Sequence, residues 1–315
     1  MGRKRKPRYE QNVEITGIAD KGRGVGRTPA GQVVFVENVA PGDVVDVVIT
    51  RKRKGTFMAS PTQYHQYSKD RVEPFCSHYA VCGGCQWQHL AYEAQLAHKE
   101  IIVRDALQRI AKVPIGEFLP ILPAPETQYY RNKLEFAFSN RRWLTREELE
   151  DKSVPLFVDV LGFHKAGAFD KIINIDHCWL EPEPSNAIRN GLRELGIEQG
   201  LSFYDTREHK GFLRQVMIRV STLGETLVLL SFAEEDEAKR NTYLDAVAER
   251  FPEITTLIYC TNTKLNDFVN DLDMFVHSGK GYIEEQLGHV RFRIGPKSFF
   301  QTNSRQGERL YAVAA

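Results

Sequence analysis

The feature that most constrains the fold of this 315-residue chain is a set of cysteines at short, fixed intervals. Cys76 is followed by Cys82 and Cys85, with five and two residues between them, and Cys178 comes 93 residues later. Thiolates at such intervals in a glycine-containing loop can bind one metal centre, and a remote fourth ligand would join that loop to a distant strand end. The fifth cysteine, Cys260, follows an apolar stretch and is predicted to be a buried strand residue.

The spacing leaves the kind of centre open. Structural zinc sites usually combine two closely spaced cysteine pairs, and only Cys82 and Cys85 form such a pair here. A triplet with a lone fourth cysteine therefore favours an iron–sulfur cluster. A zinc site with four thiolate ligands and a coincidental group of core cysteines are the alternatives. A disulfide framework is not expected from an odd number of cysteines in a cytosolic chain.

The N-terminal region carries most of the positive charge. Residues 1–60 have a formal net charge of +6 and the remaining residues one of −5. This asymmetry predicts an anionic partner that meets the N-terminal region first, although a solvated charged terminus would give the same pattern. The sequence contains neither a transmembrane stretch of about 18 apolar residues nor a secretory signal, so we expect a cytoplasmic chain with no membrane partner.

Residues 10–63 read as short strands separated by glycine- and proline-containing turns. Strands of this length and spacing predict a small closed or nearly closed β-barrel. The turn that contains Gly22, Gly24 and Gly26 resembles a dinucleotide-binding loop, but it lies between two strands and lacks the helix that such a site requires.

A run of four cations follows one of these strands, in the expected turn to Gly55: Arg51, Lys52, Arg53 and Lys54. Such a run suits a phosphate backbone, and a barrel with basic loops is a common nucleic-acid-binding architecture. A solvated loop is the alternative.

The rest of the chain alternates strand and helix patterns, which predicts an α+β layout with substantial antiparallel sheet. Helices are expected at 92–111, 183–195, 234–250 and 304–315, and strands at 130–138, 156–163, 171–175, 213–221, 226–232, 255–260 and 290–294. Within 130–138, side chains alternate between two faces, one with Asn132, Leu134, Phe136 and Phe138 and the other with Arg131, Lys133 and Glu135. Thr302 or Asn303 is the expected N-cap of the last helix. Because no residue typical of a helix end follows, we expect the sequence to be the front part of a longer protein.

Together these residues resemble the RNA (uracil-5-)-methyltransferase family, in its TRAM-containing, iron–sulfur 23S rRNA branch. The resemblance covers nearly all of residues 10–315. Its motifs are Gly22-x-Gly24-x-Gly26-Arg27, Val34-Phe35-Val36, Pro41-Gly42, Cys76-x5-Cys82-Gly83-Gly84-Cys85-x-Trp87-Gln88, Tyr130-Arg131-Asn132-Lys133, Gly162-Phe163-His164, Cys178 and Phe299-Phe300-Gln301-Thr302-Asn303.

The resemblance implies a multidomain fold: an OB-like TRAM β-barrel with a basic tail (1–70), a central α+β iron–sulfur domain (71–90 and 127–289) and the start of a doubly wound α/β methyltransferase domain (91–126 and 290–315). It implies that Cys76, Cys82, Cys85 and Cys178 hold a structural [4Fe-4S] cluster. It further implies that Gln301 contacts S-adenosyl-L-methionine and that ribosomal RNA is the partner. Arg131 and Lys133 join the four barrel cations as candidate RNA contacts.

The resemblance also implies that the catalytic residues lie beyond the position of Ala315, since none of the five cysteines matches the family's nucleophile. The expected activity is S-adenosylmethionine-dependent 5-methylation of a uridine in 23S rRNA by the full-length protein, with this chain inactive alone. Two alternatives remain: a non-catalytic iron–sulfur RNA-binding protein, and a radical adenosylmethionine methylthiotransferase. The methylthiotransferases place TRAM at the other end and use a different cysteine spacing.

Overall fold

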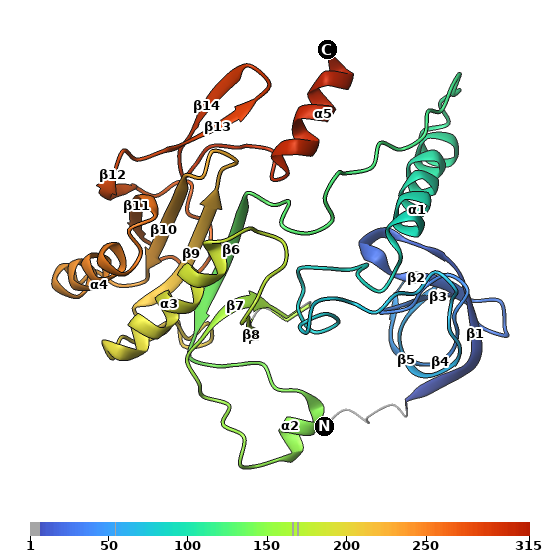
Figure 1. Ribbon diagram of the computed structural model, residues 1–315. Coiled ribbons are helices and arrows are strands. Elements are labelled where there is room, and N and C mark those ends of the chain that lie inside the picture. The colour runs from blue at the N-terminus through green and yellow to red at the C-terminus, as the bar shows by residue number, and fades with distance from the viewer. Residues whose placement is uncertain (1–6, 54, 166, 169) are drawn as a thin grey trace. The chain divides into compact units, whose positions relative to one another are not determined.

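A computed structural model describes residues 7–53, 55–165, 167–168 and 170–315 of the chain (Figure 1). The chain forms two compact units. The first comprises Met1–Ala80 and Cys85–Pro123, and the second comprises Val81–Gly84 and Ala124–Ala315.

The first unit contains a closed five-stranded barrel, which confirms the barrel predicted from the turn spacing. Its strands pair in the order β1-β2-β3-β5-β4. The interior is filled mostly by β-branched side chains, among them Val13, Val34 and Val45, together with the ring of Phe57. The elements are β1 (Arg8–Ile18), the 3-10 turn η1 (Asp20–Gly22), β2 (Gly24–Arg27), β3 (Val33–Val36), β4 (Val44–Arg53) and β5 (Thr56–Gln66).

Of the three glycines predicted in a turn only Gly22 lies in one, because Gly24 and Gly26 belong to β2, where packing inside the barrel explains them. A Cβ at Gly24 would lie 2.3 Å from Cγ2 of Val39, and one at Gly26 would lie 2.6 Å from the carbonyl oxygen of Glu14. Both distances are shorter than a van der Waals contact, so only glycine lets the strands and the core approach this closely. This agrees with the expectation that the motif is not a dinucleotide-binding loop.

We therefore expect Gly24→Ala to destabilise the barrel by about 1–3 kcal/mol, because the added methyl group overfills the core. Urea unfolding followed by circular dichroism measures the change. Gly17→Ala is the matched control, since a Cβ at Gly17 has no neighbour within 4 Å. Equal stability of the two variants would contradict the packing explanation.

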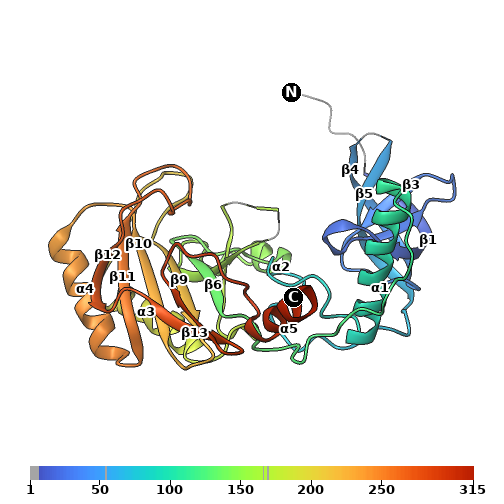
Figure 2. The ribbon, with the colours of Figure 1, turned by 90° about the horizontal axis from the view of Figure 1, so that it is seen from above.

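A helix follows the barrel, at the predicted position, and lies beside it in both views (Figures 1 and 2). The α-helix α1 (Tyr92–Asp105) continues into a π-helical turn, η2 (Ala106–Ala111). No residue of α1 or η2 is buried, and Ile110 is 81% exposed.

The second unit is built on a seven-stranded sheet with the order β12-β11-β10-β9-β6-β7-β8, in which only β10 and β11 run parallel. A separate hairpin pairs β13 with β14. The elements are β6 (Lys133–Ser139), α2 (Arg146–Glu150), β7 (Val160–His164), β8 (Ile172–Asn174), α3 (Ser185–Glu198), β9 (Leu213–Val220), β10 (Thr226–Phe232), α4 (Glu237–Arg250), β11 (Ile254–Thr261), β12 (Phe275–Gly279), β13 (Ile283–Leu287), β14 (Val290–Ile294) and α5 (Ser304–Ala314).

The two faces of this sheet have different coverings. On β10, Phe232 contacts Tyr243 of α4, so the face that carries it is the helix-covered face. Leu229, three residues earlier, points to the opposite face and packs with Ile283 and Ile294 of the hairpin. The alternation predicted for 130–138 is also confirmed, since Leu134, Phe136 and Phe138 are buried while Lys133 and Glu135 are more exposed.

The last helix, α5, begins as the sequence predicts. The side chain of Asn303 accepts a hydrogen bond from the backbone N–H of Gln306, at 2.9 Å, and so caps the helix. Within the described part of the chain, no helix has the length and apolar character needed to cross a membrane.

Candidate functional site

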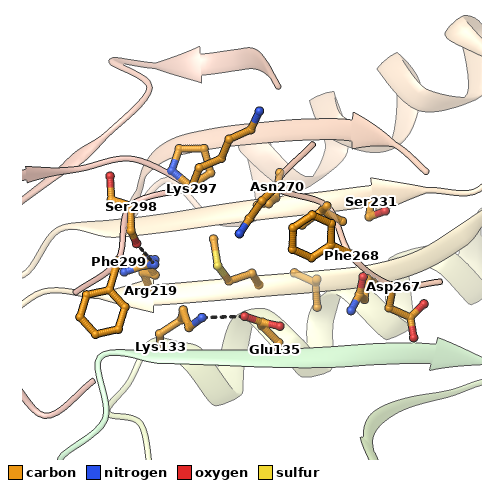
Figure 3. Close-up of a pocket in the computed structure, with 16 residues that line it drawn as sticks. Lys133, Glu135, Arg219, Ser231, Asp267, Phe268, Asn270, Lys297, Ser298 and Phe299 are labelled. Atoms are coloured by element: carbon orange, nitrogen blue, oxygen red, sulfur yellow. Dashed lines mark hydrogen bonds and ion pairs between the residues drawn. The ribbon is translucent and has the colours of Figure 1, made fainter. Parts of the chain in front are cut away.

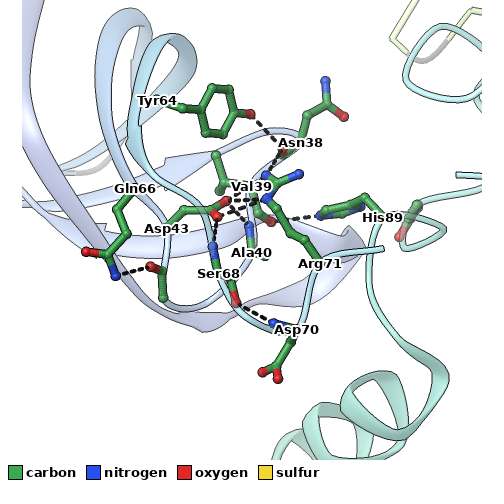
Figure 4. Close-up of polar contacts among 12 residues, drawn as sticks. Asn38, Val39, Ala40, Asp43, Tyr64, Gln66, Ser68, Asp70, Arg71 and His89 are labelled. Carbon is green, nitrogen blue, oxygen red and sulfur yellow. Dashed lines mark hydrogen bonds and ion pairs between the residues drawn. The ribbon is translucent and has the colours of Figure 1, made fainter. Parts of the chain in front are cut away.

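A buried ion pair holds the segment after the barrel against the barrel wall (Figure 4). The Asp43 carboxylate accepts hydrogen bonds from the backbone N–H groups of Ala40 and Ser68, at 2.7 and 2.8 Å. Arg71 donates to it from Nε and Nη2, the shorter distance being 2.6 Å. Burial alone raises the pKa of Asp43, but these hydrogen bonds outweigh burial and hold the pKa below its ordinary value.

Both ends of segment 71–90 meet on the barrel. Arg71 and Leu90 form an antiparallel bridge, and Nε2 of His89 lies 3.2 Å from the carbonyl oxygen of Val39. The other ring nitrogen of His89 is hydrogen-bonded to the hydroxyl of Tyr79. Burial lowers the pKa of His89, which favours the neutral ring at pH 7. The segment that carries the cysteine triplet therefore starts and ends at fixed points.

The four predicted cluster ligands are thiols rather than disulfides. Cys76 and Cys85 belong to the first unit and Cys82 and Cys178 to the second. Among the residues that the structure describes, no three or more side chains of Cys, His, Asp or Glu are grouped as a metal site. The backbone N–H of Gly84 donates to Sγ of Cys82 at 3.3 Å, a type of bond that cluster sulfurs also accept.

Helix α3 fixes the backbone of Cys178. The Asn186 side chain accepts from the N–H of Cys178 at 2.7 Å and donates to its carbonyl oxygen at 3.2 Å. Arg189, which is fully buried, donates to Oδ1 of Asn186 and to the carbonyl oxygen of Asp176, both at 2.8 Å. The position of this cysteine is therefore set by side chains that the sequence analysis did not single out.

Cys260 is buried in β11, as predicted, and burial raises the pKa of its thiol. Because the thiolate is the form that binds a metal, the buried thiol of Cys260 is not a candidate metal ligand.

The basic run of the barrel differs in one respect from its prediction. Strand β4 continues through Arg53 and pairs with β5, so Arg51 and Lys52 lie on a strand and not in the turn. Pairing with β5 extends the strand because the ladder supplies hydrogen bonds that a charged loop would lack. Both side chains are exposed. Lys54 and the side chain of Arg53 lie outside the described part of the chain.

The two candidate RNA contacts on β6 and just before it have different surroundings. Lys133 lines a cavity of about 250 Å³ and forms an ion pair with Glu135 at 2.7 Å (Figure 3). Arg131 is not among the residues that line this cavity, and its charge acts on the buried carboxyl of Glu181. Burial raises the pKa of Glu181 well above its usual range, despite the hydroxyl of Ser185 and the nearby guanidinium groups. No sequence signal distinguished Glu181 from an exposed acid.

The segment that contains Gln301 is held at the start of α5. Asn132 donates from Nδ2 to the carbonyl oxygen of Gln301 at 2.9 Å and to Oγ of Ser304 at 2.8 Å. Oγ of Ser304 in turn donates to the buried carboxylate of Glu285 at 2.7 Å. The backbone of Gln301 is thereby fixed, while its side chain forms no hydrogen bond within the described residues.

Comparison with known proteins begins with the barrel, since residues 4–60 match the TRAM domain. The chain is 45% identical to an uncharacterized RNA methyltransferase of Bacteroides thetaiotaomicron over 285 residues. The alignment covers 90% of this chain and 63% of that protein. It is 43% identical, across 307 residues, to an uncharacterized RNA methyltransferase of Porphyromonas gingivalis, covering 96% of this chain and 66% of that protein.

A solved structure with a similar fold is that of the Pyrococcus abyssi tRNA (uracil-54, C5)-methyltransferase in complex with S-adenosyl-L-homocysteine. The TM-score is 0.66 and the sequence identity 25%, and the match covers 96% of this chain and 64% of that one.

The chain therefore carries a TRAM domain and is similar over most of its length to proteins named as RNA methyltransferases. It spans 63% and 66% of the length of the two relatives named above.

Proposed function

We propose that the protein methylates C5 of a uridine in 23S rRNA, with S-adenosyl-L-methionine as the methyl donor, and that residues 1–315 supply RNA binding and part of the donor site. The observation that carries the proposal is the likeness, over 96% of this chain, to a solved uracil-C5 methyltransferase. The relatives of higher identity, named as RNA methyltransferases, agree with it.

The proposed reaction explains why RNA binding accompanies catalysis. C5 of a stacked uracil is not accessible, so the target base must leave its stack while the flanking RNA is held. The exposed cations Arg51 and Lys52 of the barrel provide a surface for the phosphate backbone. The barrel would therefore hold the RNA while another part of the protein methylates the base.

Gln301 is proposed to contact the methyl donor, which supplies a methyl group on a positively charged sulfur. Its side-chain amide forms no hydrogen bond within the described residues, and its backbone is fixed by Asn132. A single amide hydrogen bond contributes only about 0.5–1.5 kcal/mol net, so Gln301 orients the donor and does not determine its affinity alone.

Cys76, Cys82, Cys85 and Cys178 are proposed to bind a [4Fe-4S] cluster. The chemistry of the set fits, since all four are thiols and the backbone at Cys178 is held by Asn186. The cluster would hold the loop that carries Cys76, Cys82 and Cys85 and so stabilise the RNA-binding part of the protein. We assign it a structural role.

The barrel cations give a testable RNA-binding prediction. The double substitution of Arg51 and Lys52 by Ala should weaken binding of all RNA sequences alike and reduce the slope of log K against log salt by about 1–2. Fluorescence anisotropy with 23S rRNA fragments at several salt concentrations measures both quantities. Lys239→Ala, on α4 of the second unit, is a control that removes one exposed positive charge outside the barrel. If the double variant kept the wild-type slope of log K against log salt, Arg51 and Lys52 would make no phosphate contacts and would be solvated residues at the end of β4.

The function itself is tested with protein expressed from its complete reading frame. Incubation with methyl-labelled S-adenosylmethionine and unmodified 23S rRNA should give labelled 5-methyluridine after digestion to nucleosides. A parallel incubation uses unmodified tRNA, and label in tRNA but not in 23S rRNA would show that the substrate is tRNA. Label in a nucleoside other than 5-methyluridine would contradict the proposal.

A further inference from the structure

The cavity on the seven-stranded sheet has no role in the function described above. Its floor is formed by β6, β9 and β10, on the face opposite α3 and α4, and its walls by residues 267–270 and 296–299 (Figure 3). All of these residues belong to the second unit. At about 250 Å³ the cavity is smaller than the roughly 300–1,000 Å³ of pockets for drug-sized ligands, and it suits a flat group such as one base.

An unpartnered amide lies on the floor of the cavity. Oε1 of Gln215, on β9, is buried and has no hydrogen-bond partner among the described residues. Met217 and Leu229 are its apolar neighbours in the lining. A buried amide without a partner is costly unless a ligand satisfies it. An amide presents a donor and an acceptor together, which is the pattern that the hydrogen-bonding edge of a nucleobase can match.

The rim supplies an aromatic ring and positive charge. Phe268 lines the cavity and is 56% exposed, and the Lys264 ammonium lies 5.6 Å from the centroid of its ring. The carboxylates in the lining are already neutralised, because Glu135 pairs with Lys133 and Asp267 pairs with Arg214. Lys297 is exposed at the rim and forms no ion pair within the described residues.

The wall formed by residues 296–299 is held in place by a buried cation. Arg219 is 4% exposed and donates from Nη2 to the carbonyl oxygen of Ser298 at 2.7 Å. The hydroxyl of Ser298 accepts from the N–H of Gly295 at 3.0 Å, which closes the turn. The cavity is therefore a shaped site with a rigid floor and wall.

From these observations we infer that the cavity binds one unpaired nucleotide of the RNA, with the Gln215 amide hydrogen-bonded to the base edge, Phe268 stacked on the base and Lys297 near the phosphate. Because the ligand is RNA, the inference rests on the proposed function. The cavity adds recognition of a base to the phosphate contacts of the barrel.

The test compares two probes on protein expressed from its complete reading frame. One is an oligouridine of about 12 nucleotides, within the usual range of single-strand sites, and the other has the same length and charge but abasic ribose in place of the central nucleotides. Phe268→Ala should weaken oligouridine binding about 5- to 100-fold, and Gln215→Met by a smaller factor, with little change for the abasic probe. Leu265→Ala, a loop residue that is 74% exposed and does not line the cavity, should bind as wild type.

The outcomes separate this inference from the proposed function. If the barrel variants weaken both probes while Phe268→Ala and Gln215→Met bind both as wild type, the inference fails and RNA binding stands. If wild-type protein binds neither probe, RNA binding and the inference fail together. Photo-cross-linking with a 4-thiouridine oligonucleotide gives a second readout, and a cross-link to residues 266–270 or 296–299 is expected. Cross-links confined to the barrel would also overturn the inference.

Discussion

Anaerobically purified protein is expected to be brown and to contain about four irons per chain, and Cys178→Ala is expected to lose most of this iron. Cys178 is the proposed ligand that lies far from the triplet in the sequence, and its loss would leave three thiolates for the cluster. Iron analysis and the visible absorption spectrum measure the effect. A large loss of iron is expected because a cluster held by only three thiolates would have one iron exposed to solvent and oxidant.

Cys260→Ala is the matched control. Its thiol is buried in β11 and its pKa is raised, so its removal should leave the iron content unchanged. A colourless wild-type protein that contains one zinc per chain would contradict the cluster. Equal iron in Cys178→Ala and in wild type would instead remove Cys178 from the ligand set.

Asp43→Ala is expected to destabilise the first unit by about 3–5 kcal/mol, because it leaves the Arg71 guanidinium without its partner at a buried site. It also removes the acceptor of the N–H groups of Ala40 and Ser68. Hydrogen exchange of the barrel amides localises the loss, and urea unfolding measures it. Glu37→Ala, whose ion pair with Arg23 is long and exposed, should change stability little.

The same carboxylate gives a pH dependence with a defined sign. The pKa of Asp43 is lowered in the folded protein, so its stabilisation is present above the ordinary value of about 3.9 and is lost as the pH falls through the lower, folded value. Asp43→Asn should reduce the decrease in barrel stability between about pH 5 and pH 2. An unchanged acid profile in that variant would assign the decrease to other carboxyl groups.

Local patterns in the sequence predicted much of the fold. The barrel followed from strand and turn spacing, and β6 from its period-two alternation. By contrast, β12 and β13 were not predicted. In β12 the strand residues are only half-buried or exposed, and β13 carries two glutamates, one of which, Glu285, is buried by its bonds to Thr222 and Ser304. Such tertiary contacts override the local pattern.

Candidate site residues could be predicted only where residues close in sequence share a role. The cysteine triplet and the cations of β4 are local runs, and their roles stay predictions. The cavity combines β6 and β9 with residues 267–270 and 296–299, which are up to 166 positions apart, and no local pattern joins them. The pair of Asp43 and Arg71 was missed for the same reason, since only the closed barrel brings the two side chains together.

The most direct measurement of the central claim uses RNA labelled with tritium at C5 of uracil. Methylation at C5 replaces the hydrogen on that carbon, so turnover releases tritium to water, whereas methylation at a ring nitrogen, a ribose hydroxyl or another base does not. With S-adenosylmethionine, unmodified 23S rRNA and protein expressed from its complete reading frame, tritium release is expected to equal methyl incorporation mole for mole. Methyl incorporation without tritium release would contradict the account.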